Sequence, residues 1–261
     1  MSPSAAPLRV ERVRPDVLWL HPPDGGEMYV VTTDRGPVVF DTGFLKFMPV
    51  MVDAVRAAGL DPHAIRLGFV THLHADHVGA MGAWSREFGF PVAAHELAAG
   101  PIEAADPVAT GAKMVYAGMD EEFVPCPVRY RLQGGESFQV GNRRFRVIHA
   151  PGHTVGSIHI HSGDLLFVGD TLFGNGGIGW MDVHWGSNPE DYVETLERLR
   201  SFRGCFTLAG HGAPYVLTDE PIDKGTASAA FHIPYAHGLG SPRVPSLYGK
   251  PVPPAPPTLV L

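Results

Sequence analysis

The sequence contains little cysteine, no block of basic residues and no long hydrophobic run, and each absence excludes a class of protein. Its two cysteines, Cys126 and Cys205, are too few and too far apart to indicate a disulfide framework or a thiolate metal site. The net charge of −7 argues against nucleic acid as the main partner, because phosphate backbones select clustered basic side chains. No run approaches the length needed to cross a bilayer, and Met1–Val10 lacks the apolar stretch of a signal peptide. We therefore expect a cytoplasmic protein with no membrane partner.

Hydrophobic residues are numerous enough for a substantial core. They make up 44% of the 261 residues, which suffices for one large core or for two fused half-domains. Short apolar runs between Gly, Pro and Asp predict strands, and apolar residues at helical spacing predict helices. The expected strands cover residues 8–14, 16–21, 28–33, 37–41, 65–70, 91–94, 128–132, 137–140, 143–149, 157–161, 165–168 and 206–209. The expected helices cover residues 50–58, 78–88, 189–202 and 223–231, and residues 106–125 have no clear pattern. These patterns alone favour only a mixed α/β protein.

Three histidines and one aspartate follow the apolar run at 65–70, in the segment Thr71-His72-Leu73-His74-Ala75-Asp76-His77. Packing alone does not explain such a density of polar groups, because they are costly to bury. Later in the chain, three more potential ligands lie beside glycines at the ends of apolar runs. The complete set of candidate metal ligands is His72, His74, Asp76, His77, His153, Asp170 and His211.

The spacing of these residues suits two metal ions. His72 and His74 are two residues apart, so in an extended segment both side chains point the same way. Asp76 and His77 come after the chain turns and can reach a second ion, and Asp170 is the natural candidate for a carboxylate bridge. Paired ions about 3.5–4 Å apart hold a hydroxide that is a strong nucleophile near neutral pH. We expect two divalent ions, with Zn²⁺ favoured and iron, manganese or cobalt as alternatives that these ligands also suit.

The sequence resembles the metallo-β-lactamase superfamily from about Val17 to Ala213. The signature His-x-His-x-Asp-His is complete at positions 72 to 77, and Asp-Thr-Gly at 41 to 43, Gly-His-Thr at 152 to 154 and Gly-Asp-Thr at 169 to 171 also match. The resemblance implies a four-layer αββα sandwich, in which two mixed β-sheets pack face to face with helices outside.

The resemblance also implies how the ligands are divided. The first ion takes His72, His74 and His153, and the second takes Asp76, His77 and His211. Asp170 bridges the two ions, and Asp41 tethers the ligand loop from outside the metal shell. The expected catalytic residues are Asp170, through this bridge, and Asp76, because either Asp76 or a metal-bound water carries a proton to the leaving group.

Hydrolysis is the expected reaction, in which the bridging hydroxide attacks a carbonyl and the cations stabilise the oxyanion. The lactam-hydrolysing members place Cys or Ser where Asp170 stands, so the chain is more similar to glyoxalase II, acyl-homoserine lactonases and related esterases. The segment Gly177-Ile178-Gly179-Trp180 lacks the Arg of glyoxalase II relatives, and few basic residues are placed to hold the carboxylates of glutathione. We therefore expect a small, largely apolar ester, lactone or acyl thioester as substrate.

Three alternatives stay open at this point. The first is an iron-dependent oxidoreductase similar to the persulfide dioxygenases, although retention of Asp76, His77 and His211 favours two metals and hydrolysis. The second is a hydrolase with β-lactamase side activity, since the same hydroxide attacks a strained amide. The third is a binding protein on a decayed hydrolase fold, which would not need intact ligands.

Two segments supply candidate substrate contacts. In the first, Phe44 and Phe47 either form an apolar lip of the pocket or pack onto their own core. The second, residues 173–185, is rich in glycine and then in aromatics, which predicts a substrate clamp, although aromatic residues more often fill a core. Its candidates are Phe173, Trp180, His184 and Trp185. His159 and His161 alternate like a pair of ligands, but the resemblance gives them no such role, and we expect them at the surface or outside the metal shell.

The composition changes from about Thr218. We expect a catalytic domain over residues 1–217 and a C-terminal extension over residues 218–261. Past Gly238 the extension is rich in proline, which favours an extended chain and excludes the interior of a sheet. We expect it to pack on the body of the protein or on a partner subunit, and a homodimer is the candidate assembly.

Overall fold

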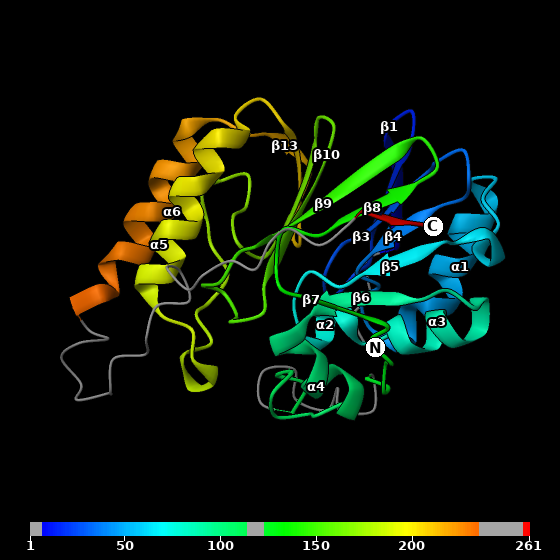
Figure 1. Cartoon of the computed structure of the whole chain (residues 1–261), viewed down its shortest axis with the longest axis horizontal. Helices are drawn as coiled ribbons and strands as arrows, with labels where there is room; N and C mark the ends of the chain where they lie inside the picture. Colours follow the sequence, from blue (N-terminus) through cyan, green and yellow to red (C-terminus); the bar gives the residue numbers. More distant parts are fainter. Residues whose placement is uncertain (1–6, 114–122, 235–257) are drawn as a thin grey trace.

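Two mixed β-sheets lie face to face at the centre of the molecule, and helices cover the outer side of each sheet (Figure 1). The computed structural model describes residues 7–113, 123–234 and 258–261. This arrangement is the αββα sandwich that the sequence implies, so the prediction of the fold class is confirmed.

The first sheet comes from the N-terminal half of the chain. In order across the sheet, its strands are β1 (Arg9–Arg14), β2 (Val17–His21), β3 (Met28–Val31), β4 (Val38–Phe40), β5 (Leu67–Phe69), β6 (Val92–His95) and β7 (Tyr130–Leu132). Neighbours from β1 to β4 are antiparallel, and those from β4 to β7 are parallel.

The second sheet comes from the C-terminal half. Its strands, in order, are β13 (Tyr215–Val216), β12 (Phe206–Ala209), β11 (Leu165–Gly169), β10 (Ile158–Ser162), β9 (Arg143–His149), β8 (Ser137–Val140) and β14 (Leu259–Val260). The parallel pairs are β11 with β12 and β14 with β8.

The helices form the two outer layers. Those of the first half are α1 (Met48–Ala57), α2 (Ala75–Val78), α3 (Met81–Phe88) and α4 (Glu96–Ala104), and those of the second half are α5 (Pro189–Arg198) and α6 (Asp219–Phe231). Short 3-10 turns are η1 (Leu45–Phe47), η2 (Pro62–Ala64), η4 (Val183–Trp185) and η5 (Leu199–Phe202). Within the described parts of the chain, no helix combines the length and the apolar character that crossing a membrane demands.

Strand alternation explains the four layers. In β2, Val17 and Trp19 belong to the apolar cluster between the sheets, whereas Leu18 and Leu20 belong to the cluster beneath α1 and α3. In β11, the residues 165 and 167 face the other sheet, and 166 and 168 face α5. Successive side chains of a strand point to opposite faces, so runs that are apolar throughout need a partner layer on both sides.

Aromatic side chains join the two sheets. The rings of Phe40 in β4 and Phe167 in β11 are stacked, with centroids 3.6 Å apart and planes 2° apart. The hydroxyl of Tyr29 in β3 donates to the carbonyl of Ala209 in β12 at 2.7 Å. The carboxyl-terminal ends of β5, β11 and β12 are thereby held against one another, and the loops that follow them begin from a fixed frame.

Some elements differ from the sequence expectations. The expected helix at 78–88 begins later, as α3 at Met81, because residue 78 ends α2 and the Ala80 N–H donates to the Gly43 carbonyl between the two helices. The patterns do not indicate α4, which contains Gly100 and Pro101 and begins with His95 as its N-cap. They also do not indicate the two-residue strands β13 and β14, which are too short to carry a pattern.

The predicted C-terminal extension begins with α6, which packs on α5 (Figure 1). The proposed boundary between residues 217 and 218 falls between β13 and α6. β14 takes an edge position beside β8. The expectation that the proline-rich segment covers the body or a partner subunit concerns residues 235–257, which lie outside the described residues.

Candidate metal centre

The seven candidate ligands lie on four loops that follow strands. His72, His74, Asp76 and His77 follow β5 and enter α2, His153 follows β9, Asp170 follows β11, and His211 follows β12. The structure therefore gathers at one place residues that are up to 139 positions apart, from His72 to His211. Both halves of the molecule contribute.

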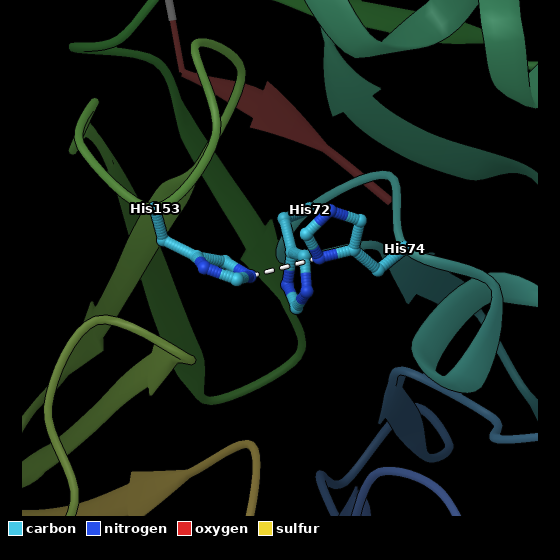
Figure 2. Close-up of side chains that lie close together, drawn as sticks. All are labelled: His72, His74 and His153. Carbon is cyan, nitrogen blue, oxygen red and sulfur yellow. Dashed lines mark hydrogen bonds between the residues drawn. The ribbon is translucent and has the colours of Figure 1, made fainter. Parts of the chain in front are cut away.

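The first triad consists of His72, His74 and His153, whose ligand atoms all lie within 4.8 Å of one another. His74 Nδ1 and His153 Nε2 are 2.9 Å apart, and Figure 2 shows His153 facing the other two rings from the opposite segment. All three side chains are buried. This is the set that the sequence assigns to the first ion.

The second triad consists of Asp76, His77 and His211, whose ligand atoms also lie within 4.8 Å of one another. His211 Nε2 is 3.3 Å from His77 Nε2 and 3.2 Å from Asp76 Oδ2. Asp76 and His77 are buried, but the His211 side chain is 39% exposed. The second triad therefore lies at the solvent side of the cluster.

The carboxylate of Asp170 faces both triads. Its Oδ1 atom is 3.3 Å from His77 Nε2, and its Oδ2 atom is 3.8 Å from His153 Nε2. Oδ2 also lies 3.3 Å from His211 Nε2. Gly210 permits this approach, because a Cβ atom there would collide with Asp170 Oδ1. A carboxylate in this position suits a bridge between two cations.

Asp41 supports the ligand loop in the way the sequence suggests. Its Oδ1 accepts from the Thr71 N–H at 2.8 Å, and its Oδ2 accepts from the Thr71 hydroxyl at 2.7 Å. Oδ2 also lies 3.1 Å from His77 Nδ1, so with its hydrogen on Nδ1 His77 presents Nε2 to the cluster. The Thr71 oxygen is in turn 3.0 Å from His72 Nδ1. Asp41 has a left-handed backbone, with φ at +50°, which is strained for a residue with a Cβ atom.

Two further outer contacts were not indicated by the sequence. His153 Nδ1 lies 2.6 Å from the carbonyl oxygen of Trp180, to which it donates. His74 Nε2 lies 3.6 Å from Asp182 Oδ2. Both contacts fall on the nitrogen that faces away from the other triad members, so they orient the rings and leave the inner nitrogens available.

Unpaired polar atoms test whether the cluster fits cations. Among the described residues, three buried atoms of the candidate ligands lack a hydrogen-bond partner: His72 Nε2, Asp76 Oδ1 and Asp170 Oδ1. A buried polar atom without a partner is costly and calls for an explanation. Zinc and related ions require nitrogen and carboxylate-oxygen donors that lie close together, and the ligand atoms of each triad lie within 4.8 Å of one another, so the residues fit.

The ionisation of the cluster agrees with this fit. Burial, together with the neighbouring His74, lowers the pKa of His153 to about 3, and burial lowers the pKa of His72 well below its ordinary value. Burial alone would lower the pKa of His77, but Asp170 and Asp76 outweigh it and raise that pKa well above the ordinary value. His72 and His153 are therefore neutral, as metal ligation requires, and the carboxylates of Asp76 and Asp170 attract positive charge.

The candidate substrate contacts take different places. Phe44 is buried against Ala75 and Ala112, so it packs as interior rather than as a lip of the pocket. Phe47 is half-buried against the same group.

The second candidate segment lies closer to the ligands. The Trp180 ring is half exposed, and its centroid is 4.9 Å from that of His74. The Phe173 ring lies 5.9 Å from that of His211. The remaining candidates, His184 and Trp185, lie on η4 and are exposed.

The other histidines lie outside the triads. His159 is buried, and its Nε2 atom is 2.9 Å from the hydroxyl of Thr171, next to Asp170. His161 is half-buried beside Cys205. Neither ring belongs to a group of three converging ligand atoms within the residues that the structure describes.

A family model described as the metallo-beta-lactamase superfamily matches residues 21–211, which is more than half of the chain. The chain therefore belongs to this superfamily, and the resemblance read from its motifs is confirmed.

Known relatives include several hydrolases. The acyl-coenzyme A thioesterase MBLAC2 of Gallus gallus is 28% identical over 262 residues, covering 82% of this chain and 89% of the relative. A hydroxyacylglutathione hydrolase of Rhizobium etli is 30% identical over 239 residues, covering 85% of this chain and 82% of the relative. The crystal structure of BJP-1, a subclass B3 metallo-beta-lactamase of Bradyrhizobium japonicum, matches with a TM-score of 0.68 at 19% identity and covers 89% of this chain and 96% of that one. At that identity the structural likeness shows the fold alone.

Proposed function

We propose that the chain is a hydrolase with a dinuclear metal site that cleaves an ester, lactone or acyl thioester of a small, largely apolar substrate. The observation that carries this proposal is the convergence of two ligand triads on one carboxylate, Asp170, which faces both. A mononuclear centre would use the first triad and leave Asp76, His77 and His211 without a function. Zn²⁺ is the proposed metal, with iron or manganese as alternatives.

Two bound cations would supply Lewis acidity and a water of lowered pKa. The chain's own residues fix the geometry for that chemistry. The Trp180 carbonyl and Asp41 hold His153 and His77 by their outer nitrogens, so neither ring has to reorganise during the reaction.

Asp76 is the proposed proton carrier to the leaving group. Burial would raise the pKa of Asp76, but His77 and His211 outweigh burial and lower it well below the ordinary value. The carboxylate is therefore ionised near neutral pH, and its Oδ1 atom is free of hydrogen bonds within the described structure. An ionised oxygen at this place can accept a proton and release it to a departing thiolate or alkoxide.

Aromatic rings beside the cluster support an apolar acyl group. Trp180 lies over the first triad, and Phe173 lies beside His211 in the second. The two relatives described above act, by their names, on acyl groups carried by coenzyme A and by glutathione, which favours thioesters within the proposed class. A cytoplasmic location and a homodimeric state remain proposals, which cell fractionation and light scattering would test.

The test begins with metal analysis and an absorbance spectrum of the purified protein. The same preparation is then assayed on p-nitrophenyl esters, lactones and acyl thioesters of increasing chain length. We expect two colourless divalent ions per chain and turnover that rises with the apolar character of the acyl group. Stoichiometric iron with persulfide-dependent oxygen uptake would instead establish the oxidoreductase, and full metal occupancy without turnover would indicate a binding protein.

A further inference from the structure

Glu27 is a buried carboxylate at the start of β3, outside the candidate ligand set. Its side chain is 1% exposed and accepts hydrogen bonds from three donors on two segments, β2 and the loop after β12. The donors are Trp19 Nε1 at 2.7 Å, His21 Nδ1 at 2.8 Å and the Gly212 N–H at 2.9 Å. A buried carboxylate with this many donors is held in one position.

The contacts of Glu27 enclose His211 on both sides. The Glu27 N–H donates to the Gly210 carbonyl at 2.8 Å, and the Glu27 side chain accepts from the N–H of Gly212. Residues 210 and 212 flank the histidine directly. The candidate histidine ligands other than His211 are almost fully buried, so the surrounding side chains restrict them, whereas His211 is 39% exposed. Its position therefore depends on the backbone of its loop.

The preceding residue contacts the other members of the same triad. The Gly26 N–H donates to the Asp76 carbonyl at 2.9 Å. A Cβ atom at Gly26 would lie 2.5 Å from the His77 ring, so only glycine permits this approach. Residues 26 and 27 thus touch Asp76 and His77 from the first half of the molecule and the His211 loop from the second.

We propose that Glu27 is a positioning residue, which fixes the His211 loop so that the second triad can hold its cation. This inference rests on the proposed dinuclear site. It predicts that Glu27 determines the affinity for the second cation and leaves the first cation unaffected. Within the described residues, the hydrogen-bond and ion-pair partners of the first triad do not include residues 26 and 27.

Glu27→Gln tests the hydrogen-bond acceptors of Glu27 without changing the size of the side chain. Oε1 accepts from Gly212, and Oε2 accepts from Trp19, with His21 shared between them. Glutamine has the same shape but only one acceptor oxygen, so either rotamer turns an NH₂ group toward one of these N–H donors. Glu27→Asp keeps two acceptors and withdraws them by one methylene group from Gly212.

The experiment titrates metal-free protein with Zn²⁺ in competition with a chromophoric chelator and yields two stepwise dissociation constants. His211→Ala, which removes the ligand itself, identifies the step that belongs to the second triad. For Glu27→Gln and Glu27→Asp we expect that step to be about 10-fold to 100-fold weaker, with the first step within about twofold of wild type. His21→Gln is the matched control, because it changes a different contact of Glu27 and leaves the contact with Gly212, and both its steps should stay within about threefold.

The outcomes separate the inference from the proposed function. If wild type binds one ion, the dinuclear proposal fails and this inference fails with it. If wild type binds two ions but the Glu27 variants weaken both steps equally, or neither step, the dinuclear site stands and the positioning role is overturned. Circular dichroism of each metal-free variant establishes whether it is folded. The positioning role of Glu27 is judged on whichever of Glu27→Gln and Glu27→Asp retains the wild-type spectrum.

Discussion

The two ligand triads use the same kinds of side chain but differ in how they are held. His72, His74 and His153 are enclosed, and the pKa values of His72 and His153 are lowered by burial. In the second triad, burial would lower the pKa of His211, but hydrogen bonds that His211 donates to Asp170 and Asp76 raise it to about 9. In the first triad, His72 and His153 are thus neutral donors at buried positions. The second offers carboxylate charge with one ligand at the rim, and the comparison predicts two unequal metal affinities.

Replacing Asp170 should weaken metal binding at both triads, so that they no longer differ. For Asp170→Ala we expect at least about a 1,000-fold loss of kcat/KM, because the shared carboxylate is lost from both ions. Metal content should fall below one ion per chain, as measured by mass spectrometry. His161→Ala, on the same half of the molecule but outside the cluster, should retain both metal and activity. An active, metal-replete Asp170→Ala enzyme would count directly against the bridging role.

Replacing one histidine in each triad should show directly that the two triads differ in metal affinity. We expect His72→Ala to lose most of its bound metal and its activity, because the enclosed triad is then incomplete. His211→Ala should keep about one ion per chain, since the first triad is intact, while its activity falls about 100-fold or more. Metal content of the two variants, purified in parallel, decides the matter. Equal loss from both would mean that the two sites load as one unit.

The stacked pair His95 and His149 provides a reference for imidazoles outside the candidate ligand set. Their ring centroids are 4.1 Å apart, and burial, followed by the neighbouring His149, lowers the pKa of His95 to about 3. The unfolded chain, with an ordinary pKa near 6.5, binds the proton more readily than the folded protein does between pH 6.5 and pH 3. Stability should therefore fall with decreasing pH in this window, by up to about 1.4 kcal/mol per pH unit for this group.

His95→Asn should make that fall shallower. Asparagine can keep the cap on α4, where His95 Nδ1 accepts from the Leu97 N–H, but it does not titrate. We expect the loss of unfolding free energy between pH 7.5 and pH 5 to shrink by about 2 kcal/mol, as measured by urea unfolding of metal-free protein. His184→Asn, at an exposed position, should leave the pH dependence as it is in wild type. An unchanged slope in His95→Asn would show that His95 stays uncharged in the unfolded chain or is charged in the folded one.

Trp180 is the candidate substrate contact that lies beside the first triad. Trp180→Ala should raise KM about fivefold to tenfold for long acyl chains and less for acetyl, because apolar contact area is lost. Trp185→Ala, also exposed but on η4, should change KM by less than about twofold. Metal content must be measured beside the kinetics, since the Trp180 carbonyl also binds His153. A loss of metal in place of a change in KM would assign Trp180 to the support of the first triad.

The sequence could predict the layers and the ligand set because each has a local pattern. All-apolar strands such as β2 require cover on both faces, and the cluster at 72 to 77 lies within one short segment. The contacts of Glu27 and Asp182 have no such pattern, since each joins loops from distant parts of the chain. The only local signal for Glu27 was a charged residue directly before a buried strand. α4 was hidden by Gly100 and Pro101, which usually indicate a loop.

Neither half of the chain owns a complete triad. The loop after β5 supplies two members of each, and the third comes from the second half, as His153 or as His211. A cation in either triad would therefore link ligands from the two halves of the chain, and its binding energy would oppose separation of the two sheets. Catalytic activity and the stability of the sandwich would then depend on the same metal–ligand bonds. Removal of the metal by a chelator would lower the free energy of unfolding as well as abolish activity.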